Sequence, residues 1–218
     1  MSKLDATVQT RSTEKAFEAF ASGRRRRLFV LVNEHEGVGR PSLTVDALAR
    51  HLVDDEHVTD TDHRSSQIHL VHRELPMLEE AGLLNWDRSA GTVSIPDQVA
   101  LDPSFLERTL ESAELDWDAV FEALSNGRRR TVLTVLREAT EALSPETLAT
   151  RVAAHKPDAD ERTVAITLHH QHLPVLREAG LVREQEDGLQ YAGDDLERAG
   201  IDTNFQLPSG QLAASVRR

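Results

Sequence analysis

The segment FEAFASGRRRRLFVLV at residues 17–32 decides the fold, because it returns as FEALSNGRRRTVLTVL at residues 121–136. Further along, ELPMLEEAGLL at 74–84 returns as HLPVLREAGLV at 172–182. The offset between the copies falls only from 104 residues (17 to 121) to 98 residues (74 to 172), so short loop deletions account for the difference. Two copies spaced this widely predict two tandem domains that fold on the same plan.

The charge of the chain is unusual in its size and in its composition. There are 37 Asp and Glu residues against 25 Lys and Arg, which gives a net charge of -12, and the only lysines are Lys3, Lys15 and Lys156. Acidic surfaces poor in lysine resemble those of proteins from salt-loving archaea, so a halophilic, archaeal, cytoplasmic protein is expected. At molar salt the Debye length is about 3 Å, so the negative total argues only weakly against binding DNA.

Several classes of protein are not indicated by the sequence. There is no cysteine, which excludes disulfides and thiolate metal sites. No run approaches the ~20 apolar residues of a membrane helix, and the first residues do not resemble a secretory signal, so no membrane partner is expected. Neither a glycine-rich phosphate loop nor a nucleophile elbow nor a helical His-Glu-x-x-His motif occurs. The chain is therefore not expected to be an enzyme or to carry a cofactor.

Each repeat is predicted to contain three helices followed by a β-hairpin. Apolar residues at helical spacing, interrupted by Ser22-Gly23, indicate helices to about 21 and over 24–34. Pro76 and Pro174 fall inside the longest helix, which is expected to kink there or to restart with proline in a new first turn. The fold class is therefore mainly α with small β-hairpins (α+β). Further elements are predicted as a capped helix over about 44–52 and 144–152, a long helix over 62–81 and 160–179, and strands at 84–87, 92–95, 182–185 and 189–191.

The predicted domain boundaries follow the two repeats. The first domain covers 16–96 and the second 118–192. A helical connector over 97–117, with a helix from about Pro103 to Ala113, joins them. A disordered N-terminal arm (1–15) and a loosely ordered C-terminal tail (193–218) flank the pair.

The order of three helices and a hairpin is that of a winged helix-turn-helix. HLPVLREAGLV is similar to the end of the recognition helix and the start of the wing in ArsR-type transcriptional regulators, and SNGRRRTVLTVL to the segment that opens their core helix. Together the segments resemble haloarchaeal tandem winged-helix domains of unknown function. The resemblance implies DNA binding, with the long helix in the major groove and the hairpin on phosphates or the minor groove. The cysteine ligands of the ArsR type are absent, so metal sensing does not carry over.

The only basic clusters are Arg24–Arg27 and Arg128–Arg130, and both open a helix. This is the unfavourable end of a helix for cations, which suggests carboxylate or phosphate partners. Four consecutive helical residues point all around the axis. The middle arginines are therefore expected to pair inside the domain, for example with Glu18 or Glu122, and the outer ones to contact phosphate.

The long helices are expected to turn an apolar stripe inward and a polar face outward. Projection at about 100° per residue places Ile68, Val71, Leu75 and Leu78 inside in the first copy, and Ile166, Leu173 and Leu176 in the second. The outward residues suit base recognition, and the alternative is a solvated helix face. The predicted DNA-binding residues are Arg24, Arg27, Arg64, Ser66, His69, Arg73, Arg88, Arg128, Arg162, Thr163, Thr167 and Gln171.

Histidines also gather on the long helices. His169 and His172, like His69 and His72, are three residues apart, a spacing that could hold two ligands of a metal. No companion motif supplies a third ligand, so no metal site is predicted. His169 is expected to be a packed core histidine, because it replaces the inward-facing Val71.

Two functions remain open from the sequence. The first is a DNA-binding transcriptional regulator on double-stranded DNA, whose tandem units imitate a dimer and present two reading helices to successive major grooves about 34 Å apart. The second is a non-catalytic protein–protein interaction or scaffold module, which the acidic total favours. A protein partner or a homodimer is compatible with either.

Overall fold

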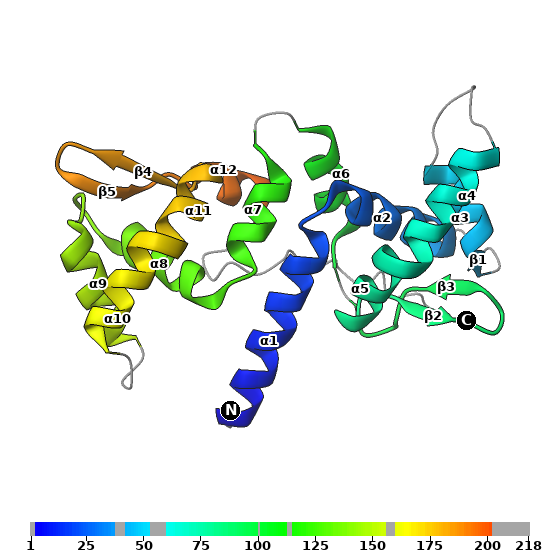
Figure 1. Cartoon of the computed structure of the whole chain (residues 1–218), viewed down its shortest axis with the longest axis horizontal. Helices are drawn as coiled ribbons and strands as arrows, with labels where there is room; N and C mark the ends of the chain where they lie inside the picture. Colours follow the sequence, from blue (N-terminus) through cyan, green and yellow to red (C-terminus); the bar gives the residue numbers. More distant parts are fainter. Residues whose placement is uncertain are drawn as a thin grey trace, which may run out of the picture. The chain divides into compact units, whose positions relative to one another are not determined.

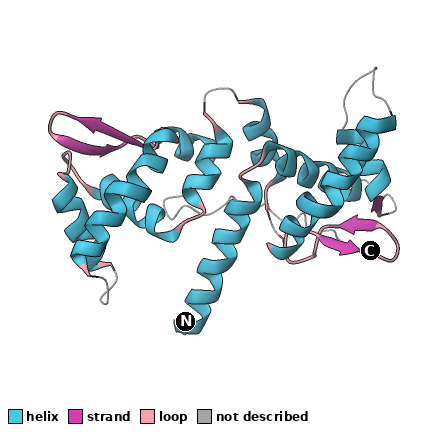
Figure 2. Cartoon of the chain, in the orientation of Figure 1, coloured by secondary structure: helices cyan, strands magenta, loops and turns pink. Residues whose placement is uncertain are grey.

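A computed structural model of the chain describes residues 3–37, 42–52, 60–99, 101–112, 115–155 and 160–201. The described chain is mainly helical with two small antiparallel β-sheets (Figures 1 and 2), which confirms the expected α+β class. It divides into two compact units: among the described residues, unit 1 comprises those of 3–21 and 112–201, and unit 2 those of 22–111. None of the described helices is long and apolar enough to cross a membrane.

Unit 2 contains most of the first repeat. Its three-stranded sheet has the order β1-β3-β2, with Leu43 opposite Val93 and Trp86 opposite Val93 on the other side. The elements in chain order are α2 (Gly23–Gly37), β1 (Leu43–Thr44), α3 (Val45–Leu52), α4 (Asp60–His69), the π-helical turn η1 (Leu70–Glu74), α5 (Leu75–Glu80), β2 (Asn85–Asp87), β3 (Thr92–Ser94) and α6 (Pro103–Glu111).

Unit 1 contains the second repeat and repeats the same order of elements. The hairpin pairs Val182 with Tyr191 and Gln185 with Gly188, and an isolated bridge from Leu143 to Leu189 lies where unit 2 has β1. The elements are α1 (Lys3–Phe20), α7 (Trp117–Leu124), α8 (Gly127–Glu138), α9 (Pro145–Ala154), α10 (Glu161–Thr167), η2 (Leu168–His172), α11 (Leu173–Glu178), β4 (Val182–Gln185), β5 (Gly188–Tyr191) and α12 (Asp194–Ala199).

The helix ends in unit 1 follow the local sequence. The Ser144 hydroxyl accepts a hydrogen bond from the Thr147 N–H at 3.2 Å, and Pro145 occupies the first turn of α9. Asp160 caps α10 by accepting from the Thr163 N–H at 2.9 Å. Gly180 ends α11 with a φ of 71°, the left-handed conformation that glycine adopts without a steric penalty. These features confirm the predicted helix boundaries.

The π-helical turns are the structural response to the two interior prolines. An α-helical turn would press the ring of Pro76 against the carbonyl of His72. In η1 the Leu75 N–H instead donates to the carbonyl of Leu70, five residues back, and α5 restarts with Pro76 in its first turn. Leu173 and Pro174 repeat this arrangement after η2. The expected restart at the prolines is therefore confirmed.

The ends of the chain differ from the sequence expectation. Lys3–Phe20 forms one helix, where a disordered arm was expected over 1–15, because this segment contains neither Gly nor Pro. The tail continues as α12, whose Leu196 is buried together with Ile201, so hydrophobic burial holds the chain as far as residue 201. The rest of the tail, 202–218, lies outside the described residues.

The opening helix of the first repeat packs in unit 1 rather than with the rest of its own repeat. The rings of Phe17 and Phe20 lie 6.0 Å and 6.1 Å from that of Phe121 on α7, and Trp117 lies 5.9 Å from Phe121 on its own helix. In unit 2, α6 packs against α2. The aromatic residues at the start of both repeats therefore pack together in the core of unit 1. The connector helix α6 packs in unit 2.

Candidate nucleic-acid interface

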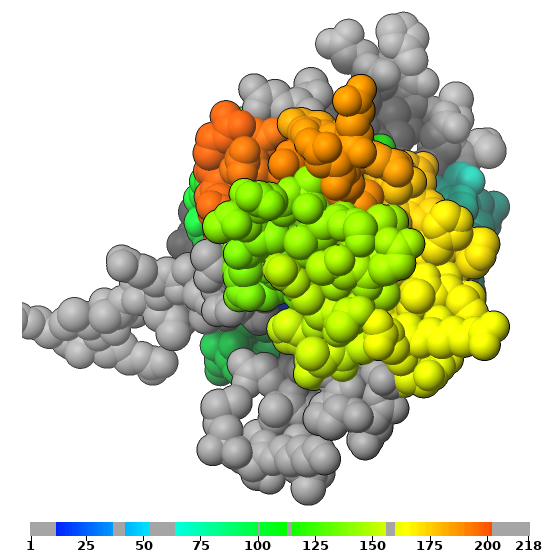
Figure 3. Space-filling view, turned by 90° about the vertical axis from the view of Figure 1, so that its left-hand side faces the viewer, coloured from blue at the N-terminus to red at the C-terminus, as the bar shows by residue number. Residues whose placement is uncertain are grey.

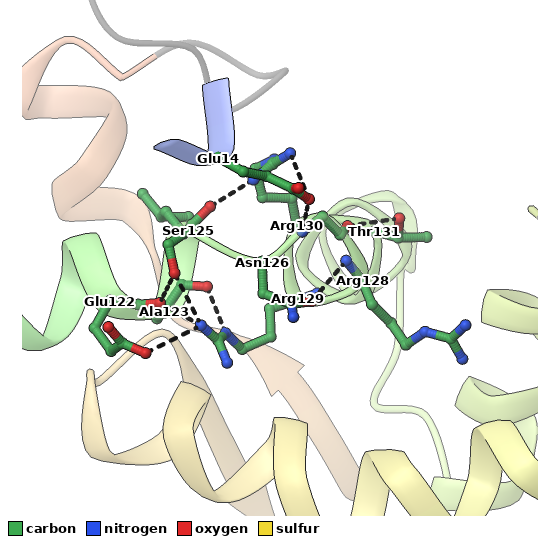
Figure 4. A network of polar contacts seen from close by, with 11 residues as sticks. Glu14, Glu122, Ala123, Ser125, Asn126, Arg128, Arg129, Arg130 and Thr131 are labelled. Carbon is green, nitrogen blue, oxygen red and sulfur yellow. Dashed lines mark hydrogen bonds and ion pairs between the residues drawn. The ribbon is translucent and has the colours of Figure 1, made fainter. Parts of the chain in front are cut away.

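Two arginines at the start of α8 bind the end of the preceding helix (Figure 4). Arg129 Nε donates to the Ala123 carbonyl at 2.7 Å, and its Nη2 donates to the Glu122 carbonyl. Arg130 Nη1 donates to the Leu124 carbonyl at 2.6 Å. These carbonyls end α7 and carry the negative end of its dipole. Arg129 and Arg130 belong to the N-terminal turn of α8, whose dipole disfavours cations. Their guanidinium groups nevertheless lie at the C-terminus of α7, whose dipole attracts cations.

Carboxylates complete the environment of these two guanidinium groups. Glu122 lies 3.6 Å from Arg129 Nη2, and Glu14 of α1 lies 3.7 Å from Arg130 Nη2. The Glu14 Oε1 atom also accepts from the Gly127 N–H at 2.8 Å, so it caps the N-terminus of α8 (Figure 4). Burial lowers the pKa of Arg129 and Arg130, but arginine remains charged in proteins. The predicted internal pairing, including the Glu122 partner, is confirmed.

The corresponding arginines of unit 2 are also buried. Arg25 Nη1 lies 3.3 Å from Glu74 Oε2 in a buried ion pair, and Arg26 is buried as well. Arg24 Nη2 donates to the Ser66 hydroxyl at 2.6 Å. Ser66 is 5% exposed, so the expectation that it contacts DNA is wrong: its hydroxyl binds Arg24 inside the unit.

Two outer arginines of the clusters, Arg27 and Arg128, lie at or near the surface, whereas Arg24 and Arg130 are held inside their units. Arg27 is exposed and Arg128 is half-buried. Figure 4 shows the Arg128 side chain extending away from the network around Arg129 and Arg130. Arg128 could therefore contact a ligand without breaking the bonds that Arg129 and Arg130 make to α7.

The inward face of each long helix follows a pattern that the sequence projection predicted only in part. Leu75, Leu78, Leu173 and Leu176 are buried as predicted. Upstream of them the buried positions are Ser66, Leu70 and Glu74 in unit 2 and Val164, Leu168 and His172 in unit 1, spaced by four residues. Ile68 and Ile166 are each 53% exposed, which corrects the expectation that both are buried. A π-helical turn contains one residue more than an α-helical turn. A projection at about 100° per residue across it therefore places the upstream residues on the wrong side.

Exposed acidic residues on the long helices lie towards the helix ends, as Glu80, Glu161 and Glu178 do. Neither 64–73 nor 162–177 contains Asp or Glu, although 37 of the 218 residues of the chain are acidic. Figure 3 shows the yellow α10–η2–α11 segment at the surface of unit 1. Among the predicted DNA-binding residues, those exposed on these helices are Arg64, His69, Arg73, Arg162, Thr163 and Gln171. Each unit thus presents a basic and polar helix face in an otherwise acidic protein.

The two threonines of α10 hold the helix itself. Thr163 is exposed, but its hydroxyl and its N–H both donate to Asp160 Oδ2, at 2.7 Å and 2.9 Å. The half-buried Thr167 donates its hydroxyl to the carbonyls of Thr163 and Val164. Both hydroxyl protons are engaged within the helix, so neither threonine presents a hydroxyl donor to a ligand.

The hairpins are poorly suited to phosphate. Arg88 makes two hydrogen bonds to the Glu79 carboxylate, at 3.1 Å and 2.6 Å, and lies 4.2 Å from the centre of the Trp86 ring. The same pairing lowers the pKa of Glu79. In unit 1, Arg177 pairs with Glu184 of β4 at 2.7 Å, and the exposed turn that follows is acidic. Arg88 was predicted to bind DNA, but its guanidinium is already neutralised by Glu79.

The histidines divide between the surface and the interior. His169 is exposed, so the expected core role for it is wrong; His172, three residues later, is the buried one. Burial, together with the charges of Arg129 and Arg128, lowers the pKa of His172. The rings of His169 and His170 meet edge to face at 4.7 Å on the surface. Within the described residues, no three His, Asp or Glu side chains gather as a metal site.

Sequence projection missed the outward-facing isoleucines and the neighbouring histidines. Ile68 and His72 lie on the exposed side in unit 2, and Ile166 and His170 lie there in unit 1. A signal for them exists in the sequence. The isoleucine and the histidine each recur 98 residues later in the second repeat. The neighbouring Val71 and Arg73 do not, because His169 and Gln171 stand at the equivalent positions.

Comparison with protein families identifies the two repeats. The model of a domain of unknown function, DUF7344, matches residues 17–94 and 121–189. These two segments coincide with the copies recognised in the sequence, so the expected membership of a family of unknown function is confirmed. No curated protein and no solved structure matches the chain.

Proposed function

The chain belongs to the DUF7344 family, and we propose that this member is a DNA-binding transcriptional regulator that reads double-stranded DNA with the outward faces of its two long helices. In each unit a hairpin follows two shorter helices and the long helix (α2, α3 and α4–η1–α5 in unit 2; α8, α9 and α10–η2–α11 in unit 1). This order supports a winged helix-turn-helix arrangement, in which the long helix enters the major groove. The lysine-poor, acidic composition supports a salt-rich cytoplasm as the setting.

The observation that carries the proposal is the charge of these faces. A protein with a net charge of -12 would repel a polyanion at most of its surface. Residues 64–73 and 162–177 instead combine arginine, histidine and glutamine without one carboxylate. Glu74, which directly follows the first segment, is buried against Arg25, whereas Glu161 and Glu178 flank the second segment at exposed positions. A partner that is itself negative fits these faces better than a basic or neutral one.

The two units are expected to read different bases. Arg73 and Gln171 occupy equivalent positions at the offset of 98, and both are exposed. Arginine forms two hydrogen bonds with guanine in the major groove, and glutamine forms two with adenine. The preferred site is therefore asymmetric, with a guanine in the half read by unit 2 and an adenine in the half read by unit 1.

The test is selection of duplexes from a random library by the full chain at low and at molar potassium chloride. Molar salt suppresses non-specific attraction, so only specific contacts survive there. We expect Arg73→Ala to lose the guanine preference and Gln171→Ala the adenine preference, each at a cost of about 1–3 kcal/mol. Arg128→Ala should weaken binding to all sequences alike, because phosphate contacts carry no sequence information.

Arg198→Ala is the matched control, because it removes the same charge from the exposed face of α12, where Arg198 pairs with Asp195. It should bind as the wild type does. Enrichment of no sequence by the wild type at either salt concentration would refute the regulator. The protein-interaction module would then be the better hypothesis, with the same helix faces as the surface to test.

A further inference from the structure

Three residue types recur on the outward face of both long helices. Unit 2 presents Arg64, Ile68 and His72, and unit 1 presents Arg162, Ile166 and His170. All six side chains are exposed. Residues four apart lie on the same side of a helix, so each trio forms a row, here called the Arg-Ile-His row. The row is the same in both units, whereas the neighbouring Arg73 is replaced by Gln171.

The isoleucines are the unexpected members of the row. Each is 53% exposed, and within the described residues the other large hydrophobic side chain that is exposed is Leu110. The inward positions are already filled by Leu70 and Leu168, so the isoleucines are not needed to close the core. Single exposed apolar residues are common on protein surfaces. An isoleucine at the same exposed position of two otherwise diverged helices calls for a common ligand.

The surroundings of the row decide which ligand fits. An arginine lies one turn before the isoleucine and a histidine one turn after it, within segments 64–73 and 162–171, which contain no carboxylate. A neutral apolar groove of a protein would gain nothing from these charges, whereas the DNA major groove is lined by phosphates. Its bases carry one apolar group, the C5 methyl of thymine, which proteins contact with aliphatic side chains.

The geometry points to thymine recognition by Ile68 and Ile166, one thymine methyl in each half of the bound DNA, with the flanking arginines on the adjacent phosphates. The inference rests on the proposed function and goes further, because it names a base that both halves of the site share. The asymmetric purine contacts of Arg73 and Gln171 then distinguish the two halves.

The test uses the duplex that the wild type selects and replaces its thymines with deoxyuridine, one position at a time. Deoxyuridine pairs as thymine does and lacks only the methyl group. We expect one position in each half-site at which the replacement weakens wild-type binding about fourfold, the contribution of one buried methyl group. Ile68→Ala should abolish the effect in one half, and Ile166→Ala in the other.

Two controls keep the result interpretable. Leu110→Ala shortens another exposed apolar residue, on α6, and should retain both uridine effects. Circular dichroism should show that Ile68→Ala and Ile166→Ala fold, as expected for half-exposed side chains. Selective binding that is indifferent to every uridine would overturn thymine recognition and leave the regulator standing. Failure to enrich any duplex would overturn the regulator, and thymine recognition with it.

Discussion

Arg25 and Glu74 form a buried ion pair, with Arg25 Nη1 3.3 Å from Glu74 Oε2, and the same two positions in the other unit hold Arg129 and His172. The repeat has therefore kept the buried arginine and exchanged its carboxylate for an imidazole. Arg129 compensates by binding the carbonyls at the end of α7. His172 is left with a buried Nδ1 atom that has no hydrogen-bond partner. One core thus depends on charge pairing, and the other on keeping a histidine neutral.

Replacing Glu74 by glutamine should destabilise unit 2 by about 3 kcal/mol, because it removes the carboxylate that pairs with a buried guanidinium. Chemical denaturation of the full chain would measure the change. Glu34→Gln, at an exposed position of α2 in the same unit, should change stability by less than about 0.5 kcal/mol. Equal effects of the two variants would mean that the ion pair contributes nothing.

Acid should destabilise unit 1 through His172. Its pKa lies below the ordinary value of 6.5, because burial and the charges of Arg129 and Arg128 disfavour the imidazolium. Below about pH 6.5 the unfolded chain therefore binds a proton that the native unit does not, and the free energy of unfolding falls as the pH falls. Thermal unfolding between pH 7.5 and about 5 should show a shallower pH dependence for His172→Gln than for the wild type.

The control for that experiment is His170→Gln, because the His170 imidazole is exposed on the same helix. It should keep the wild-type dependence on pH. If His172→Gln and His170→Gln gave the same curve, the buried histidine would not be the acid-sensitive group.

Glu14 should stabilise the start of α8 from the opening helix of the chain. Glu14→Ala removes the acceptor of the Gly127 N–H and the carboxylate beside Arg130, so a loss of about 1–2 kcal/mol is expected. Glu14→Gln keeps an acceptor for Gly127 and loses only the attraction to Arg130, so its cost should be smaller. Urea denaturation measures both variants, and an alanine variant as stable as the wild type would show that the cap is dispensable.

The elements were predictable because their signals are local and occur twice. Ser144 and Asp160 cap helices, Gly82 and Gly180 end them, and the hairpins follow alternating runs. Internal pairing of the middle arginines was also predictable, since consecutive helical residues cannot all face solvent. Their main partners were not, because the carbonyls at the end of α7 carry no signature in the sequence.

The outward face of the long helices was the least predictable part of the site. Projection assumed one uniform helix, whereas the π-helical turns before Pro76 and Pro174 shift the register by one residue. Ser66 moved inside and Ile68 moved outside as a result. The packing of Phe17 with Phe121 rather than within its own repeat was equally hidden, because both copies begin with the same aromatic pattern.

Alanine substitutions along the long helices should distinguish the observed helix, in which Ile68 and Ile166 face outward, from the uniform α-helix of the sequence projection, in which they face inward. Leu75→Ala and Leu173→Ala remove fully buried side chains and should each cost about 2–5 kcal/mol. Ile68→Ala and Ile166→Ala should cost less than about 1 kcal/mol, since half of each side chain is already in water. Denaturation midpoints of the four variants give the comparison. A large loss of stability in Ile68→Ala or Ile166→Ala would mean that the isoleucines are buried, as the uniform-helix projection predicted. The Arg-Ile-His row would then not be an exposed surface.

Salt should stabilise the whole chain. With 37 acidic against 25 basic side chains, repulsion between surface carboxylates opposes the compact state in dilute buffer. Raising potassium chloride to molar concentration shortens the Debye length to about 3 Å and screens this repulsion, so the midpoint of thermal unfolding should rise. A variant with Glu138, Glu141 and Glu186 changed to glutamine removes three exposed carboxylates. It should melt higher than the wild type in dilute buffer and gain less from added salt. If the wild type melts at the same temperature in both buffers, local pairing such as that of Arg177 with Glu184 already balances the acidic surface.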